Sequence, residues 1–335
     1  MRVGLSYDLK DTILSRPDSP EDALEEYDSP ETITALVVAI ESLGHSVIKL
    51  GGGRALINNI LQQKVDIVFN IAEGRGNYRS REAQVPAILE MLDVPYSGSD
   101  PQCLAICLDK PLSKKLISAV GISTPDWRVI QNNHELNAIN EDDILFPVFI
   151  KPAHEGSSMG IDSGSRIDDF TELEKKVSNM LELYRQPILI EEFISGDDIT
   201  VGIVGNSPPT VVGMMRVLPR KCSSQFVYSI EIKRNWEHLV EYECPAKLGE
   251  RVLEKIEDYS LKIYQTLECK DFARIDFKLG PGVEPFFLEI NPLPGLNPNS
   301  GDLPIMAYKL GWTYDELVAT VLNAAIGRYS QWFQK

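Results

Sequence analysis

The sequence predicts an α/β protein with more than one domain, and three observations lead to that class. The chain has 335 residues, more than a single hydrophobic core usually organises. Hydrophobic residues make up 43% of it and charged residues 24%, as in a soluble globular protein. In the first third, short apolar runs alternate with helical patterns. That alternation predicts a parallel sheet with helices on its faces.

Charge and cysteine content exclude several classes of protein. Lys and Arg total 33 and Asp and Glu total 49, so the net charge is −16, which disfavours binding to nucleic acid. No apolar run reaches the roughly 18–20 residues of a membrane helix, and the opening MRVGLSYDLK lacks the apolar region of a signal peptide. Cys103 and Cys107 share a helix face, but no CxxC or Cys/His cluster accompanies them, so a disulfide framework or structural zinc site is not expected. We therefore expect a cytoplasmic protein without membrane or nucleic-acid partners.

The first third contains three predicted strands and one clear helix. A Pro- and acid-rich loop at 15–30 precedes apolar residues that recur at helical spacing over 33–43, and Gly44 supplies a helix stop. Ligands bind beyond the carboxyl ends of parallel strands, which places Glu73–Gly76 at a candidate binding edge. The predicted strands are 2–6, 46–50 and 66–70.

The rest of the chain is predicted to be rich in antiparallel strands. A Gly/Ser-rich segment covers 156–164, and helices are expected over 170–184, around 248–267 and at the C-terminus. Gly280-Pro281-Gly282 forms a turn between the last two strands. The predicted strands are 127–130, 147–151, 188–193, 199–204, 211–217, 272–279 and 285–290.

The segment with the most chemistry is FARIDFKLGPGVEPFFLEINPLPG. Alternate side chains of a strand share a face, so Arg274 lies beside Asp276 and Glu289 beside Asn291. Two such strands side by side would gather hard oxygen ligands suited to Mg²⁺. The stiff loop Pro292–Gly295 could aim a backbone N–H at a substrate. The alternative is a surface hairpin with one Arg–Asp pair.

Two further segments point to a nucleotide. FPVFIKPAHEGSSMGI delivers Lys151 at a strand end, and its Gly/Ser loop could wrap phosphates with N–H and hydroxyl groups. PILIEEFISGDDITVGIVG offers backbone groups at 191–194 to an adenine and the Asp198 carboxylate to a ribose. A plain hairpin and an acidic surface turn are the respective alternatives. The sequence has no Gly-Lys dipeptide and no GxGxxG, which excludes a Walker P-loop and disfavours a dinucleotide site.

Together and in this order, these segments resemble the ATP-grasp superfamily and, within it, the D-alanine–D-alanine ligase group. The likeness covers nearly the whole chain and is clearest in NIAEGRGNYRSREAQVPAILEMLDVPYSGSDPQCLAICLDK. It implies the three-domain ATP-grasp fold, an α/β architecture. Residues 1–111 would form an N-terminal parallel-sheet domain, 112–196 a small central α+β domain, and 197–335 a C-terminal α+β domain with the metal ligands.

The resemblance also assigns roles to individual residues. The implied cofactors are ATP, as co-substrate, and Mg²⁺, with Mn²⁺ as the alternative metal. Two segments are candidate lids that would exclude water, the Gly/Ser loop and 226–236. The implied ATP-binding residues are Lys110, Lys151, Glu155, Ser157, Ser158, Glu191, Phe193, Ile194, Asp198 and Lys233; the metal ligands are Asp276, Glu289 and Asn291; the catalytic groups are Arg274, Lys233, Ser157 and the Gly295 N–H; and substrate contacts come from Glu73, Arg75, Arg234 and Ser300.

The implied reaction has two steps. ATP phosphorylates a carboxylate to an acyl phosphate, and an amine then displaces phosphate. The sequence departs from the D-alanine ligases at substrate-facing positions, namely 26–29, Lys233-Arg234 and 300–303. The leading interpretation is therefore a ligase that joins an amino acid to a small acid or to a vinylogous acid of the mycosporine-glycine type. The alternatives are a D-alanine–D-alanine ligase of cell-wall synthesis and a non-catalytic nucleotide-binding protein. Ligases of this group are commonly homodimers, although no feature of the sequence shows an interface.

Overall fold

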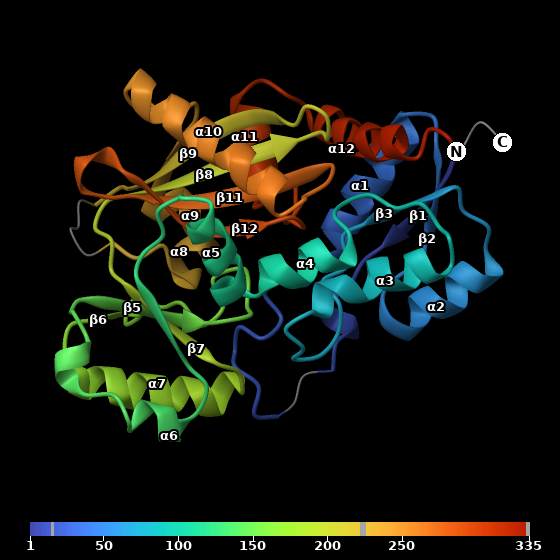
Figure 1. Cartoon of the computed structure of the whole chain (residues 1–335). Coiled ribbons are helices and arrows are strands. Elements are labelled where there is room, and N and C mark those ends of the chain that lie inside the picture. The colour runs from blue at the N-terminus through green and yellow to red at the C-terminus, as the bar shows by residue number, and fades with distance from the viewer. Residues whose placement is uncertain (15–16, 222–225, 333–335) are drawn as a thin grey trace.

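Three β-sheets, each from a different part of the sequence, organise the chain (Figure 1). The computed structural model describes residues 1–14, 17–221 and 226–332. The C-terminal helix packs beside the first helix (Figure 1). The last part of the chain therefore packs against the first.

The first sheet has the order β2-β1-β3 and is parallel, as the alternating pattern predicts. The side chains of β3 are buried throughout. Helix α1 begins after Ser29, whose hydroxyl accepts a hydrogen bond from the Thr32 N–H. The elements are β1 (Arg2–Ser6), β2 (Ser46–Lys49), β3 (Ile67–Asn70), α1 (Pro30–Ser42), α2 (Gly53–Gln62) and α3 (Gln84–Met91).

The second sheet has the order β4-β7-β5-β6 and is antiparallel. Helix α7 buries Leu173, Val177 and Met180, which lie at helical spacing, in the core beside this sheet. The elements are β4 (Trp127–Ile130), α6 (Asn133–Leu136), β5 (Val148–Pro152), β6 (Arg166–Ile167), α7 (Phe170–Tyr184) and β7 (Ile188–Glu192).

The third sheet, also antiparallel, has the order β10-β9-β8-β11-β12. Helix α10 packs on it through Ile256, Ile263 and Tyr264. The sequence predicted the bounds of β11 correctly, and β12 runs one residue further than expected. The elements are β8 (Asp197–Val204), β9 (Thr210–Pro219), α8 (Ile230–Arg234), α9 (Trp236–Leu239), β10 (Val240–Glu243), α10 (Glu250–Thr266), β11 (Phe272–Leu279) and β12 (Pro285–Asn291).

Helices from both ends of the chain connect the sheets. Helices α4 (Pro101–Leu108) and α5 (Lys110–Ala119) pack on β12. Helix α12 (Tyr314–Arg328) shares one core with α1, and α11 (Asp302–Lys309) packs on β8 and β9. The sequence patterns did not single out α2 to α5, because their apolar stripes are short.

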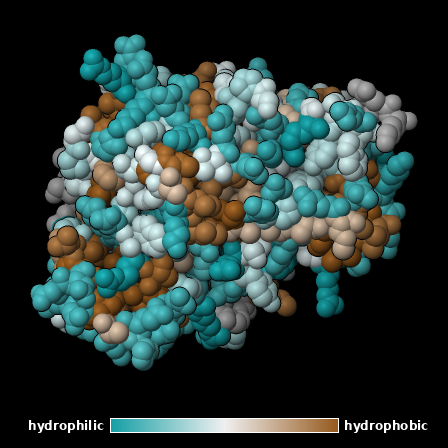
Figure 2. Space-filling model, viewed as in Figure 1, coloured by the Kyte–Doolittle hydropathy of each residue, from teal (hydrophilic) through white to brown (hydrophobic). Residues whose placement is uncertain are grey.

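The predicted domain boundaries fall at element ends. The boundary after residue 111 lies in the first turn of α5, and the boundary after residue 196 lies at the start of β8. This division of the chain stays a prediction. Within the described residues, no helix is both long and apolar enough to cross a membrane. Figure 2 shows a mainly hydrophilic face on which hydrophobic side chains gather in separate patches.

Candidate active site

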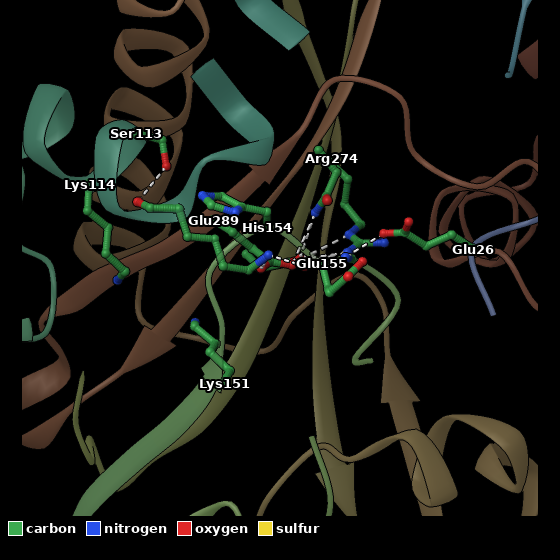
Figure 3. A network of polar contacts seen from close by, with 12 residues as sticks. Glu26, Ser113, Lys114, Lys151, His154, Glu155, Arg274 and Glu289 are labelled. Carbon is green, nitrogen blue, oxygen red and sulfur yellow. Dashed lines mark hydrogen bonds and ion pairs between the residues drawn. The ribbon is translucent and has the colours of Figure 1, made fainter. Parts of the chain in front are cut away.

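The second and third sheets enclose a cavity of about 120 Å³. Strand β5 contributes Lys151, β7 contributes Glu191, and β11 contributes Asp276. Strand alternation explains why these side chains line the cavity, because every second side chain of a strand points to the same face. Figure 3 shows Lys151 and Glu289 reaching this region from different strands.

Strands β11 and β12 bring the predicted metal ligands together. Asp276 lies opposite Glu289 and Arg274 opposite Asn291, and the register shifts directly after Asp276. The Asn291 amide lies 3.4 Å from oxygens of both Asp276 and Glu289. Thr200 of β8 donates a hydrogen bond of 3.0 Å to Asp276. The alternative of a surface hairpin does not hold, because these carboxylates are only 19% exposed.

Neighbouring cations set the charge of this cluster. Burial acts to raise the pKa of Glu289, but Lys110, Lys151 and Arg274 together hold that pKa well below its usual range. The Lys110 Nζ lies 3.3 Å from the Glu289 carboxylate. Burial raises the pKa of Asp276, while Arg274 opposes the rise. The neighbouring cations thus favour the ionised form of Glu289 more than that of Asp276.

The donor set fits a hard divalent cation. Two carboxylates and one amide oxygen on adjacent strands are ligands that Mg²⁺ takes, with its remaining positions left for water and phosphate oxygens. Because the amide O and N of Asn291 are distinguished only by their hydrogen bonds, its oxygen can turn toward a bound cation. Asp276, Glu289 and Asn291 are thus the residues that would hold the metal.

A buried ion-pair network lies beneath the cavity. The Glu191 carboxylate accepts from Lys114 at 2.6 Å and from Lys151 at 2.8 Å. Burial lowers the pKa of Lys114 to about 8, and Glu191 opposes that shift. The sequence analysis missed Lys114, although it lies four residues after Lys110 on one helix and so shares its side of α5. This network fixes Lys151 at the cavity floor.

The Gly/Ser loop is tied to the N-terminal part of the chain. Ser157 and Ser158 both have left-handed backbone conformations, with φ of 46° and 58°, which are unusual for non-glycine residues. Glu155 pairs with Arg81 at 3.1 Å, and its backbone carbonyl accepts a hydrogen bond from Lys110. Glu26 accepts from the Gly156 N–H and from Arg81. Figure 3 shows Glu26 and Glu155 on the two sides of this contact.

The predicted nucleotide linker follows β7. Glu191, Phe193 and Ile194 line the cavity together with Asp198. Asp198 is held by Lys278 at 2.9 Å, so its carboxylate has a fixed position. The backbone passes very close to Leu279 here. A Cβ on Gly196 would lie 1.9 Å from the Leu279 carbonyl oxygen, so this position requires glycine.

Arg274 connects the metal-ligand strands to a second and a third cavity. Its guanidinium lies 2.8 Å from Asp276 and 3.1 Å from Asp302. The second cavity, of about 60 Å³, is lined by Arg274, Ser157 and Gly295, among others. The third, of about 270 Å³, is lined by Lys233, Arg274, Gly295 and Asp302. The predicted catalytic groups therefore surround one continuous region.

The four predicted substrate contacts fall in different places. Glu73 lines the second cavity and Ser300 the third. Arg75 instead pairs with Asp8 at 2.9 Å, and Arg234 pairs with Glu25 at 2.6 Å. Asp302 and Glu26 line the third cavity. Both belong to segments that the resemblance places toward the substrate, but neither was predicted as a site residue.

Glu73 and Glu82 bring two further carboxyl groups to the second cavity. Neither carboxyl has a hydrogen-bond or ion-pair partner among the residues that the structure describes. Burial raises the pKa of Glu82 to about 8; Glu26 adds to the rise, whereas Arg81 and Lys110 oppose it. Burial likewise raises the pKa of Glu73 well above its usual range. A cationic group of a substrate in this cavity would favour the ionised form of these carboxyls.

Glu82→Gln is expected to stabilise the protein increasingly as the pH rises from about 5 to 8. In this window the unfolded chain has lost the Glu82 proton and the folded chain retains it, so folding stability falls as pH rises. Glutamine removes that penalty, with a gain on the order of a few kcal/mol at pH 8. Urea unfolding at both pH values measures it. The exposed Glu257→Gln is the control, and a gain for Glu82→Gln that does not vary with pH would contradict the assignment.

The fold and site together define a nucleotide-using enzyme of the ATP-grasp type. Its lysines, its carboxylate–amide cluster and its Gly/Ser loop meet where two antiparallel sheets face each other. Residues 116–323 match the family described as D-ala D-ala ligase C-terminus. The chain belongs to this D-alanine–D-alanine ligase family, and it is an ATP-dependent ligase that forms a C–N bond.

Individual relatives agree with this family assignment. A D-alanine–D-alanine ligase of Aquifex aeolicus is 34% identical over 296 residues, covering 88% of this chain and 94% of that protein. An uncharacterised protein, y4sG, of Sinorhizobium fredii is 31% identical over 310 residues, covering 88% and 87% of the two chains. The structure of a Bacillus anthracis D-alanine–D-alanine ligase complexed with ATP covers 99% of both chains, with a TM-score of 0.75 and 23% identity. The predicted ATP-grasp fold is thereby confirmed.

Proposed function

We propose that this enzyme joins two D-alanine molecules, with Mg²⁺ as its divalent cation. The observation that carries the proposal is the 34% identity to the Aquifex aeolicus D-alanine–D-alanine ligase across almost the whole of both proteins. Cell-wall synthesis is the process that such a dipeptide would serve. This was the alternative in the sequence analysis, and the comparisons favour it over the broader interpretation of an unspecified amino-acid ligase.

Different side chains would bind the phosphates and the metal in the first step, the formation of the acyl phosphate. Lys110, Lys151 and Lys233 would neutralise the phosphates of ATP, and Asp276, Glu289 and Asn291 would hold the metal. A divalent cation supplies charge neutralisation to the triphosphate. The carboxylate of the first amino acid attacks the γ-phosphorus, so that ADP leaves and an acyl phosphate forms.

The second step needs an oxyanion site. The amine attacks the acyl carbon, a tetrahedral intermediate forms, and phosphate leaves as the amide bond closes. Arg274 and the Gly295 N–H would stabilise the negative oxygen, since both line the second and third cavities. Ser157 lines the second cavity with them, and its loop would exclude the water that hydrolyses acyl phosphates.

One observation favours a second candidate, a ligase with another acceptor. Asp302 places a carboxylate, 10% exposed, within 3.1 Å of Arg274 in the third cavity. Glu25 and Asp28 line the same cavity. These acids disfavour an acceptor whose carboxylate would lie beside Arg274. An activated vinylogous acid of the mycosporine-glycine type is one version of this candidate.

Release of ADP with D-alanine as the sole amino acid separates the two candidates. The purified protein with Mg²⁺ and ATP is expected to turn over on D-alanine alone and to yield the dipeptide, identified by mass spectrometry. A panel of other D- and L-amino acids and amines without a carboxylate provides the comparison. If D-alanine gives no ADP release while a calorimetric titration shows that ATP still binds, the proposal is overturned. In that case, Asp302→Asn should increase the use of acceptors that carry a carboxylate.

A further inference from the structure

Three cysteines from distant parts of the sequence meet at one point. Cys103 and Cys107 lie one turn apart on α4, and Cys269 lies just before β11. The Cys103 Sγ is 3.8 Å from the Cys107 Sγ and 3.5 Å from the Cys269 Sγ. All three sulfurs lie within 4.8 Å of one another. The sequence analysis found only the pair on α4 and did not expect a metal site there.

The spacing of the sulfurs matches that around a thiophilic metal ion. Metal–sulfur bonds of about 2.3 Å separate two ligands by about 3.8 Å in tetrahedral geometry and about 4.0 Å in trigonal geometry. The observed separations of 3.5 and 3.8 Å require only small side-chain adjustments. Because each thiol is 2–3% exposed, bulk water does not compete for the ligands.

The second cavity gives the cluster an entry route. Cys107 lines the second cavity beside Lys110 and Glu82, so an ion can reach the sulfurs from there.

We propose that Cys103, Cys107 and Cys269 form a binding site for a thiophilic divalent cation of the zinc and cadmium class. The ion forms three metal–sulfur bonds and displaces the thiol protons, without oxidation or reduction. It links α4, which leads into Lys110, to the start of β11, which carries Arg274 and Asp276. This site is separate from the Mg²⁺ ligands, because soft thiolates select a different class of metal from hard carboxylates.

Titration of the reduced, metal-free full-length protein with Cd²⁺ tests the proposal. Excess Mg²⁺ keeps the carboxylate site occupied during the titration. We expect one Cd²⁺ per chain, a sulfur-to-cadmium charge-transfer band in the ultraviolet, and a higher melting temperature. Cys103→Ser and Cys269→Ser should each weaken binding at least 100-fold and remove the band.

Cys244→Ser is the matched control, because Cys244 is a free cysteine outside the cluster. It should bind Cd²⁺ as the wild type does. Melting in metal-free buffer identifies variants that fail to fold, and one folded variant of Cys103 or Cys269 suffices for the test. Absence of the band in the wild type, or a band that persists in a folded Cys103 or Cys269 variant, would overturn the proposal. Ligase activity is not needed for this measurement, so its failure is independent of the proposed function.

Discussion

Glu289→Gln is expected to lower kcat by about 1,000-fold or more. Glutamine keeps the shape of the side chain but removes the ionised oxygen that lies opposite Asp276 and 3.3 Å from Lys110. The metal would lose a charged ligand, and Lys110 would lose its carboxylate partner. Steady-state ADP release at saturating ATP and amino acid measures the change.

Glu284→Gln is the matched control for this result. Glu284 lies on the same β11–β12 hairpin, but its carboxylate is 33% exposed and pairs with Lys255 at the surface. Loss of that pair should leave kcat within a factor of about two, because exposed ion pairs contribute little. A kcat for Glu289→Gln close to that of the wild type would refute the assignment of Glu289 as a metal ligand.

Arg274→Lys is expected to lower kcat by about 100- to 1,000-fold while leaving the KM for ATP nearly unchanged, as the loss of one oxyanion donor does elsewhere. Lysine keeps the positive charge that Asp276 and Asp302 need, so the fold should survive. It loses the planar fork that can bind these carboxylates and still donate to a developing oxyanion. Separate determination of kcat and of KM for ATP and amino acid checks the assignment.

Arg216→Lys serves as the control for this second substitution. Arg216 pairs with Asp197 and Glu243, each at 2.8 Å, on the same sheet and does not line any of the three cavities of the site. Its replacement should leave both parameters close to those of the wild type. An effect of Arg274→Lys confined to the KM for ATP would place Arg274 on the nucleotide instead of on the oxyanion.

The position of the acidic loop before α1 could not be predicted from the sequence. The sequence could not decide whether this loop covers a substrate or only decorates the surface. In the structure it reaches the Gly/Ser loop, where Asp22 accepts from the Gly160 N–H at 2.7 Å and Glu26 accepts from the Gly156 N–H. The N-terminal loop thus contacts the Gly/Ser loop, and the bonded residues lie 130 and 138 positions apart in the sequence.

Local periodicity alone determined much of the site. Alternation along a strand places Arg274 beside Asp276 and Glu289 beside Asn291 whatever the rest of the fold does, because successive side chains point to opposite faces. Apolar runs and helical spacing likewise predicted the bounds of β1, β11 and α7 correctly. Residue order and the family resemblance then led to the ATP-grasp fold, which the comparisons confirm.

Only the tertiary structure decided which distant groups touch. Three contacts join residues from separate elements: the ion pair of Lys114 with Glu191, the ion pair of Asp302 with Arg274, and the Sγ–Sγ contact of Cys269 with Cys103. No local pattern encodes such pairs, because they depend on how helices and sheets pack and on where buried charges find partners. The sequence by itself therefore determined the chemistry available to this ligase, and packing decided which side chains hold that chemistry in place.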